Sequence, residues 1–265
     1  MATLLDVSEI AYSLFKSLLF RPVIAGVWRP WVEGAENIPA SGPALVASNH
    51  LSAGDTVALP AMIPRRMVFP AKAEAFSGHD LKSKVVAWFL KAVGMHPMER
   101  SGGRASAEGL LEVAEVLDNG DLLGIYPEGT RSPDGRLYKG KTGVARLALH
   151  AGVPVIPVAM INSQLHKGLF GIPMMRRAGI RIGRPLDFSE YAGRTNDREV
   201  LRWITDRVMA AIDELSGQEY VDVYGTSVKS GNFTPEQLAE KVLARPGLGS
   251  TKPPVELPGA TDDGS

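Results

Sequence analysis

Residues 43–55 read Pro-Ala-Leu-Val-Ala-Ser-Asn-His-Leu-Ser-Ala-Gly-Asp, and this stretch contains the transition on which the fold prediction depends. Its first part, Pro43–Ser48, is a short apolar run that is typical of a strand covered on both faces. A helix is predicted to follow over Asp55–Met62, after a polar turn that contains Gly54. A buried strand, a turn and a helix in this order predict one repeat of an α/β fold.

The same alternation continues along most of the chain. Further strands are predicted at Arg66–Ala71, Met95–Met98, Leu122–Tyr126, Val153–Ile161 and Ile180–Ile182, and helices near Leu81–Val93, Ala105–Leu117, Val144–His150 and Arg198–Leu215. The fold class predicted is therefore α/β, with a mostly parallel central sheet and helices on both faces. The folded domain is expected over residues 34–224. The pattern decays after residue 224, and a disordered tail is predicted over residues 225–265.

An amphipathic helical segment is predicted for residues 1–33. Its apolar residues recur at three- and four-residue spacing and are Val7, Ile10, Ala11, Leu14, Phe15, Leu18 and Leu19. Charged residues interrupt the run, which is too short for a spanning helix of about 20 mostly apolar residues. Pro22 is expected to kink or end the first helix. With Trp28 and Trp31 nearby, the segment is interpreted as a contact with a membrane interface; packing against the domain itself is the alternative.

Composition excludes several classes of protein. Lys+Arg and Asp+Glu are both 29, so the broad positive field of a nucleic-acid-binding protein is absent. There are no cysteines, which rules out disulfides, thiolate metal sites and a cysteine nucleophile. No Gly-x-Ser-x-Gly motif occurs, so a serine hydrolase is not expected. The histidines lack the spacing of metal ligands, and no metal site is predicted.

His50 and Asp55 are the first pair of residues that could act in catalysis. Five residues rotate about 500° on a regular helix, so the two side chains would not share a face there. Gly54 and the end of the strand indicate a turn instead, in which Asp55 bends back towards the imidazole. A carboxylate that holds one ring nitrogen leaves the other free to accept a proton from an alcohol. The alternative is that Asp55 only caps the following helix.

Three further blocks follow in order. They are Gly94-Met95-His96-Pro97-Met98-Glu99-Arg100, Tyr126-Pro127-Glu128-Gly129-Thr130-Arg131-Ser132, and the apolar run Val153–Val158. Together with residues 49–55, this ordered set strongly resembles the glycerolipid acyltransferases, and within them the 1-acylglycerol-3-phosphate (lysophosphatidic acid) acyltransferase branch. The resemblance covers roughly residues 35 to 190. His-x4-Asp alone is a weak signal, whereas the block around Glu128 is much more specific.

The resemblance implies a role for each block. His50 would be the general base for the acceptor hydroxyl, and Asp55 would orient it. Substrate binding is implied for Lys72, Arg100, Glu128, Gly129 and Arg131. Pro154 and Pro157 would shape the acyl-binding region, and His96 stands where the family prefers an apolar residue. The residue types agree with this reading, because Lys72, Arg100 and Arg131 each follow a predicted strand, and ligands of open α/β sheets gather at the carboxyl ends of strands.

The activity implied is transfer of a fatty acyl group from acyl-CoA or acyl carrier protein to 1-acyl-glycerol-3-phosphate, which forms phosphatidic acid. Another lysophospholipid or glycerol-3-phosphate stays open as the acceptor. No cofactor is implied beyond the acyl donor, and the partners expected are a lipid surface and the two substrates, with no nucleic acid. The expected location is the cytoplasmic face of the cell membrane, as a peripheral or monotopic protein.

Two other functions are weighed against this one. Residues 135–142 match the phosphate-loop pattern G-x4-G-K-T, which would indicate a nucleotide-binding protein. That loop should leave a buried strand directly, whereas Ser132-Pro133-Asp134 precedes Gly135 and the nearest predicted strand ends at Tyr126. A non-catalytic lipid-binding module is the third possibility, and it would retain lipid without transferring an acyl group.

Overall fold

The computed structural model describes residues 18, 20–72 and 113–255, except 169–170, 172 and 176. Between residues 73 and 112 it describes 76–78, 80, 83–84, 87, 90, 95–98 and 109. For residues 71–72 and 96–98 only the backbone is described. Arg100 and the greater part of the helices predicted at 81–93 and 105–117 lie outside the described residues, as does the stretch of residues 1–17.

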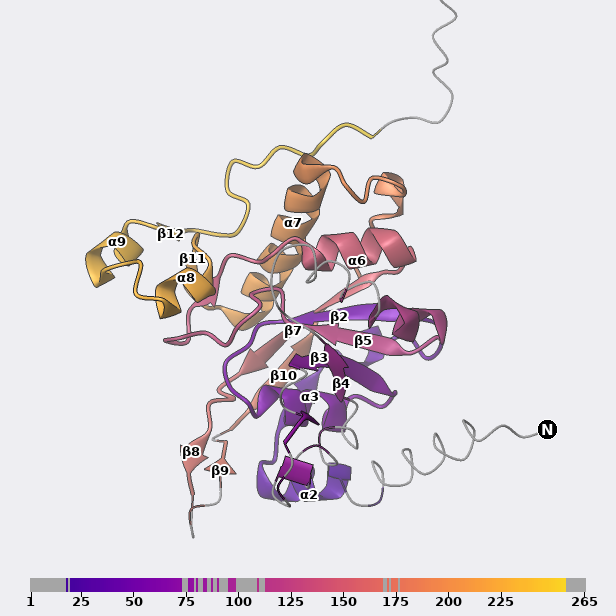
Figure 1. Cartoon of the computed structure of the whole chain (residues 1–265), viewed down its shortest axis with the longest axis vertical. Coiled ribbons are helices and arrows are strands. Elements are labelled where there is room, and N and C mark those ends of the chain that lie inside the picture. Colours follow the sequence, from indigo (N-terminus) through magenta and orange to yellow (C-terminus); the bar gives the residue numbers. More distant parts are fainter. Residues whose placement is uncertain are drawn as a thin grey trace, which may run out of the picture.

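A seven-stranded sheet with the order β1-β10-β7-β2-β5-β3-β4 forms the centre of the molecule (Figure 1). Its strands are β1 Trp31–Glu33, β2 Ala44–Ser48, β3 Met67–Lys72, β4 Met95–Met98, β5 Leu122–Ile125, β7 Val155–Ile161 and β10 Gly179–Ile182. From β7 to β4 all neighbours are parallel, whereas β10 pairs antiparallel with β7 and parallel with the edge strand β1. The prediction of a mostly parallel α/β sheet is confirmed.

Both faces of the sheet are covered, as its uninterrupted apolar strands require. In β2, Leu45 and Ala47 belong to the core beneath the helices α6 (Gly143–Ala151) and α7 (Arg198–Ser216). Ala44 and Val46 point the other way, into the core shared with α3 (Asp55–Met62). Figure 1 shows α6 and α7 on one side of the sheet and α3 on the other. The alternation is the period-two geometry of a strand, here with both sides buried.

The long helix α7 has clear signals at both ends. Asp197 precedes it, and its side chain accepts hydrogen bonds from the backbone N–H groups of Glu199 and Val200. Gly217 follows it at φ 64°, a left-handed conformation that glycine adopts without strain. The predicted span Arg198–Leu215 is therefore confirmed to within one residue.

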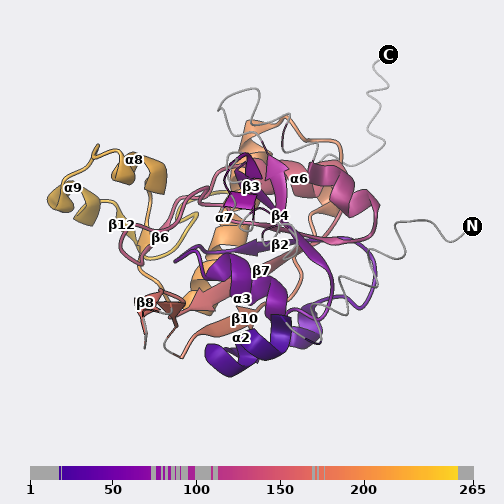
Figure 2. The same cartoon turned by 60° about the horizontal axis from the view of Figure 1, so that its bottom comes forward.

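The segment before the sheet contributes one described helix, α2 (Arg21–Val27), with Pro22 in its first turn. It lies beside α3 (Figure 2). Trp28 donates its indole N–H to the carbonyl of Pro173 at 2.9 Å, and the ring of Trp31 lies over Gly179. Both tryptophans are thus half-buried against the domain. Among the described residues, no helix combines the length and the apolar character needed to cross a bilayer.

The expected disordered tail is wrong for residues 225–255. This part contains α8 (Gly225–Lys229), α9 (Pro235–Ala239) and β12 (Val242–Leu243). β12 pairs with β11 (Tyr220–Val221), which pairs in turn with β6 (Leu137–Tyr138). Figures 1 and 2 show this unit to one side of the main sheet. Residues 256–265 lie outside the described part.

The C-terminal unit is held together by its own apolar cluster. Val221, Val223 and Leu238 are buried against Tyr138. Thr234 begins α9 with a reciprocal capping box to Gln237. The remaining short elements are the strands β8 (His166–Lys167) and β9 (Pro173–Met174) and the 3-10 turns η2 (Ala35–Asn37) and η5 (Ser189–Tyr191).

Candidate active site

The end of β2 is locked to the neighbouring strand by Asn49. Its side-chain oxygen accepts from the N–H of Met160 at 2.7 Å, and its amide nitrogen donates to the carbonyl of the same residue at 3.0 Å. The amide nitrogen also donates to Gln218 Oε1 at 2.6 Å. Asn49 is fully buried, so these bonds fix the direction in which the chain leaves the sheet.

Asp55 bends back towards His50, as the turn geometry predicted. Its Oδ2 lies 2.9 Å from His50 Nδ1 and also accepts from the backbone N–H groups of Leu51 at 2.6 Å and Ser52 at 2.8 Å. The carboxylate is fully buried, whereas 13% of the His50 side chain is exposed. Three donors on one oxygen hold the carboxylate in a single orientation, and that orientation directs it at Nδ1.

Gly54 lies close to the end of the Met175 side chain, which would have to move to make room for a larger residue. A β-carbon there would lie 2.0 Å from Met175 Cε. The turn is tied further by Ser52, whose hydroxyl donates to the carbonyl of Ser163 at 2.6 Å and accepts from the N–H of Gly54 at 3.0 Å. Sequence analysis used Gly54 as a sign of a turn, and the structure adds that the turn is tightly packed against Met175.

The imidazole of His50 is stacked on Tyr126. The ring centroids are 3.9 Å apart and the planes differ by 12°. Burial first, and then the charge of Asp55, raise the pKa of Tyr126 well above its ordinary value, so the phenol stays neutral. Sequence analysis placed Tyr126 at the end of a strand and at the start of the block around Glu128, but assigned it no role. The signal available was its place directly before Pro127 and Glu128.

The contact with Asp55 selects the tautomer of a neutral His50 ring. When neutral, the ring keeps its hydrogen on Nδ1, which donates it to Asp55. Nε2 then carries a lone pair, and it has no hydrogen-bond partner in the described part of the chain. This is the arrangement that a general base for an alcohol needs.

Glu128 holds the backbone of the histidine. Its Oε1 accepts from the N–H of His50 and its Oε2 from the N–H of Tyr138, each at 3.1 Å. The N–H of Ser132 donates to the His50 carbonyl at 2.6 Å. Burial raises the pKa of Glu128 to about 8, against the opposing effect of the two backbone donors. The geometry gives Glu128 a positioning contact, and its implied substrate-binding role stays a prediction.

The other predicted substrate-binding residues are placed to different extents. Gly129 and Arg131 are exposed on the loop that follows Glu128, next to His50. Lys72 ends β3, whose parallel neighbour β5 leads into the same loop, but only its backbone is described. Arg100 follows β4 and lies outside the described residues. The structure therefore brings His50, Asp55, Glu128, Gly129 and Arg131 together.

Residues 135–142 do not form a nucleotide phosphate loop. The stretch contains β6, which pairs with β11, and the side chain of Tyr138 is buried. Arg136 turns back to pair with Asp134 at 2.6 Å, and Lys139 pairs with Asp222 at 3.0 Å. A phosphate loop instead leaves its backbone N–H groups open around the ligand. Among the described residues there is also no cluster of side chains suited to a metal ion.

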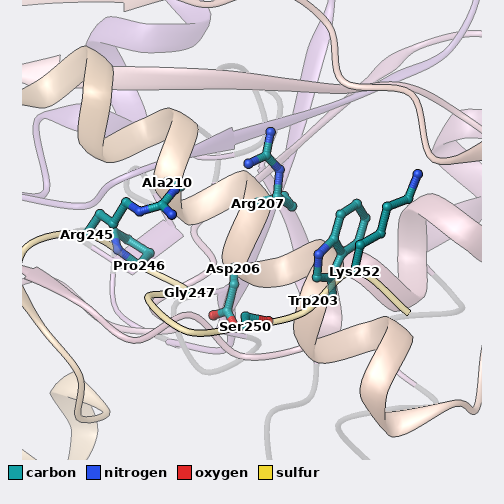
Figure 3. Close-up of a pocket in the computed structure, with 9 residues that line it drawn as sticks. All are labelled: Trp203, Asp206, Arg207, Ala210, Arg245, Pro246, Gly247, Ser250 and Lys252. Carbon is teal, nitrogen blue, oxygen red and sulfur yellow. The ribbon is translucent and has the colours of Figure 1, made fainter. Parts of the chain in front are cut away.

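A pocket of about 220 Å³ lies elsewhere, between α7 and residues 245–252 (Figure 3). Trp203, Arg207 and Arg245 are among its lining residues. It includes none of the residues around His50. The site is therefore defined by its side-chain geometry and not by this pocket.

Comparison with known proteins identifies a family for this arrangement. The sequence model of the acyltransferase family matches residues 29–161, half of the chain, and this range includes His50, Asp55, Glu128 and Arg131. The chain is 32% identical over 133 residues to the chloroplastic 1-acyl-sn-glycerol-3-phosphate acyltransferase LPAT1 of Arabidopsis thaliana. This alignment covers 50% of this chain and 36% of that protein. It is 34% identical over 134 residues to the human 1-acyl-sn-glycerol-3-phosphate acyltransferase alpha, covering 50% of this chain and 46% of that one. The chain thus spans less than half the length of these two relatives.

Two bacterial proteins align over more of the chain. The 1-acyl-sn-glycerol-3-phosphate acyltransferase of Bacillus subtilis is 28% identical over 189 residues, covering 71% of this chain and 88% of that protein. The crystal structure of the 1-acyl-sn-glycerophosphate acyltransferase PlsC from Thermotoga maritima matches with a TM-score of 0.52 and 27% identity, covering 79% of each chain. The family match includes the His50–Asp55 pair, and these findings lead to one conclusion: the chain belongs to the acyltransferase family.

Proposed function

We propose that this protein transfers a fatty acyl group from an acyl thioester to the free hydroxyl of 1-acyl-glycerol-3-phosphate, and so forms phosphatidic acid. The observation that carries the proposal is the contact of His50 Nδ1 with Asp55 Oδ2 at 2.9 Å, beside a loop that holds Arg131. The names of the plant, human and bacterial relatives agree in specifying this acceptor.

The reaction needs one proton acceptor and no enzyme nucleophile. His50 Nε2 takes the proton of the acceptor hydroxyl while the hydroxyl oxygen attacks the thioester carbonyl carbon. A new C–O bond forms and the C–S bond breaks. The leaving thiolate takes the proton back from the imidazolium, so the products are an ester and a free thiol and His50 is regenerated. Asp55 stabilises the imidazolium while it exists.

Positive charge near the pair supports a phosphate-bearing acceptor. A phosphate monoester is well bound by a guanidinium group, which can donate two parallel hydrogen bonds. Arg131 lies on the loop clamped to His50, and we propose that it contacts the phosphate. Lys72 and Arg100 are proposed to assist from the carboxyl ends of β3 and β4.

We further propose that residues 1–33 make a peripheral contact with a membrane, at its cytoplasmic face. Val23 and Val27 lie one turn apart on α2 and are 48% and 41% exposed, and Leu18 is 73% exposed. Exposed apolar residues on one side of a helix favour partition into the headgroup region. The double variant V23S/V27S is expected to sediment less with vesicles of anionic phospholipid. L248S, at an exposed leucine remote in sequence, serves as its control, and equal sedimentation of wild type and V23S/V27S contradicts the proposal.

The activity is tested by mass spectrometry of the products. Palmitoyl and oleoyl thioesters of coenzyme A and of acyl carrier protein are offered with 1-oleoyl-glycerol-3-phosphate, other lysophospholipids or glycerol-3-phosphate. Phosphatidic acid is the expected product, and H50A is expected to lower its rate by roughly 10²- to 10⁴-fold, the usual effect of losing a general base. H150A changes an exposed histidine at the end of α6 and is the control. Turnover by H50A equal to that of wild type refutes the mechanism.

A further inference from the structure

The loop formed by Gly129, Thr130 and Arg131 is flanked by two lysines from other parts of the chain. Lys229, the last residue of α8, donates from Nζ to Thr130 Oγ1 at 2.8 Å. The side chain of Lys141 passes so close to Gly129 that a β-carbon there would lie 3.2 Å from Nζ. With Arg131, three cations therefore surround the loop that is attached to His50.

These cations differ from their neighbours in having no carboxylate partner. Within the described part of the chain, Lys141, Arg131 and Lys229 form no ion pair, whereas nearby Arg136 and Lys139 each do. The buried carboxyl group of Glu128 acts on Lys229 only through its charge, because both of its oxygens accept hydrogen bonds from backbone N–H groups. Cations gathered without compensating charge repel one another, and an anion between them would relieve that repulsion.

The helix that carries Lys229 is held in place by packed structure, and the exposed lysine side chain is tied to the loop by its bond to Thr130. A β-carbon on Gly225, the first residue of α8, would lie 3.3 Å from Thr130 Cγ2, so the helix rests directly on the loop. Val228 packs against the cluster that contains Tyr138 and Val221. Partial desolvation and then the charge of Arg131 lower the pKa of Lys229, which agrees with a crowded cationic position.

We propose that Lys229 is a substrate-binding residue that holds the phosphate monoester of the acceptor together with Arg131. The inference rests on the proposed function and adds to it a residue from the C-terminal unit. A phosphate dianion has three oxygens to satisfy, and an ammonium group placed opposite a guanidinium group binds it from a second side. Because Glu128 and Ser132 tie the same loop to the backbone of His50, a phosphate bound there positions the free glycerol hydroxyl near Nε2.

Steady-state kinetics test this assignment. K229M is compared with K229R and with the control K241M, which removes an exposed lysine from the same C-terminal unit. With 1-oleoyl-glycerol-3-phosphate, K229M is expected to raise the acceptor KM about tenfold while kcat changes little, and K229R is expected to restore most of the affinity. With 1-oleoylglycerol, which lacks the phosphate, K229M and wild type are expected to have the same KM. An unchanged KM for the phosphorylated acceptor, or an equal rise for both acceptors, overturns the proposal.

Direct binding separates this inference from the proposed reaction. Titration calorimetry with 1-oleoyl-glycerol-3-phosphate is carried out on H50A and on H50A/K229M, neither of which needs to turn over. Weaker binding by the double variant supports the phosphate-binding role of Lys229. That support holds even if wild type forms no phosphatidic acid, because missing product would refute only the proposed function. Equal binding by the two proteins, or no binding by H50A, overturns the assignment of Lys229. K229M and K241M are expected to unfold at the same temperature as wild type, which would show that the compared proteins are folded.

Discussion

The imidazole of His50 and the phenol ring of Tyr126 lie face to face, 3.9 Å apart between centroids. Tyr126 rests in turn against Phe69, with 5.2 Å between centroids. The plane of the imidazole is thus set by an aromatic stack that begins in the core, while the bond to Asp55 sets the direction of Nδ1 within that plane.

The first prediction concerns this stack. Y126F keeps the ring and removes a hydroxyl that is buried without a hydrogen-bond partner among the described residues, so stability is expected to change by less than about 1 kcal/mol. Y126A removes the whole ring and is expected to cost about 3–5 kcal/mol. Urea unfolding measures both, and kcat is expected to fall in Y126A only. Loss of activity in Y126F would show that the hydroxyl itself takes part in the reaction.

The second prediction concerns Asp55. In D55N the group facing Nδ1 can become an amide donor, which favours the wrong tautomer of His50 and removes the charge that stabilises the imidazolium. We expect kcat to fall by roughly 10²- to 10⁴-fold, with a smaller change in the acceptor KM. D187N removes an exposed carboxylate that only bonds Ser189 and is the matched control. Near wild-type kcat in D55N would leave Asp55 with a capping role alone.

The third prediction is a pH dependence of stability caused by Glu128. Its pKa is about 8 in the folded protein and has an ordinary value of 4.5. Between these two values the folded state binds more protons than the unfolded state, so stability falls as the pH rises through this window. Scanning calorimetry is expected to show a smaller fall of Tm with pH in E128Q than in wild type. The quantity to compare is the slope of Tm against pH. The absolute Tm of E128Q is expected to be lower at every pH, because an amide has only one oxygen and cannot accept both backbone hydrogen bonds. Equal slopes in the two proteins would contradict the prediction.

The fourth prediction concerns the bond between β2 and β7. N49A leaves the buried N–H and carbonyl of Met160 without their partner, at a cost of roughly 1–3 kcal/mol for each group. N37A removes one half-buried bond to the carbonyl of Ile182 and is expected to cost about 1 kcal/mol. Denaturant unfolding compares the two variants. A smaller loss in N49A than in N37A would show that Asn49 does not fix the strand ends.

Sequence patterns predicted the parts of the fold that depend on local chemistry. The apolar runs at residues 44–48, 122–125 and 155–161 became neighbouring central strands because each is apolar on both faces. The bend of Asp55 towards His50 was predictable because the strand ends in a polar stretch with Gly54 directly before the helix, a pattern that is typical of a turn.

The features that were missed depend on contacts between distant segments. Tyr126 lies under His50 only because β5 is the sheet neighbour of β2, an order that no local pattern encodes. Residues 225–255 were predicted to be disordered because their elements are short: α8 and α9 have five residues each and β12 has two, too few to show a clear periodicity. What orders this part of the chain is the burial of Val221 and Leu238 against Tyr138, about which the local sequence gives no information.

The parallel pairing of β11 with β6 has a consequence for protein synthesis. Tyr220 is bonded alongside Leu137, more than eighty residues earlier, and the loop of Glu128 leads into β6. A ribosome therefore releases His50 and Asp55 long before it makes the strand that flanks this loop. A nascent chain that ends before Tyr220 carries His50 and Asp55 but lacks β11 and the lysine of α8, so the phosphate contact that we propose for Lys229 can form only after α8 has been made.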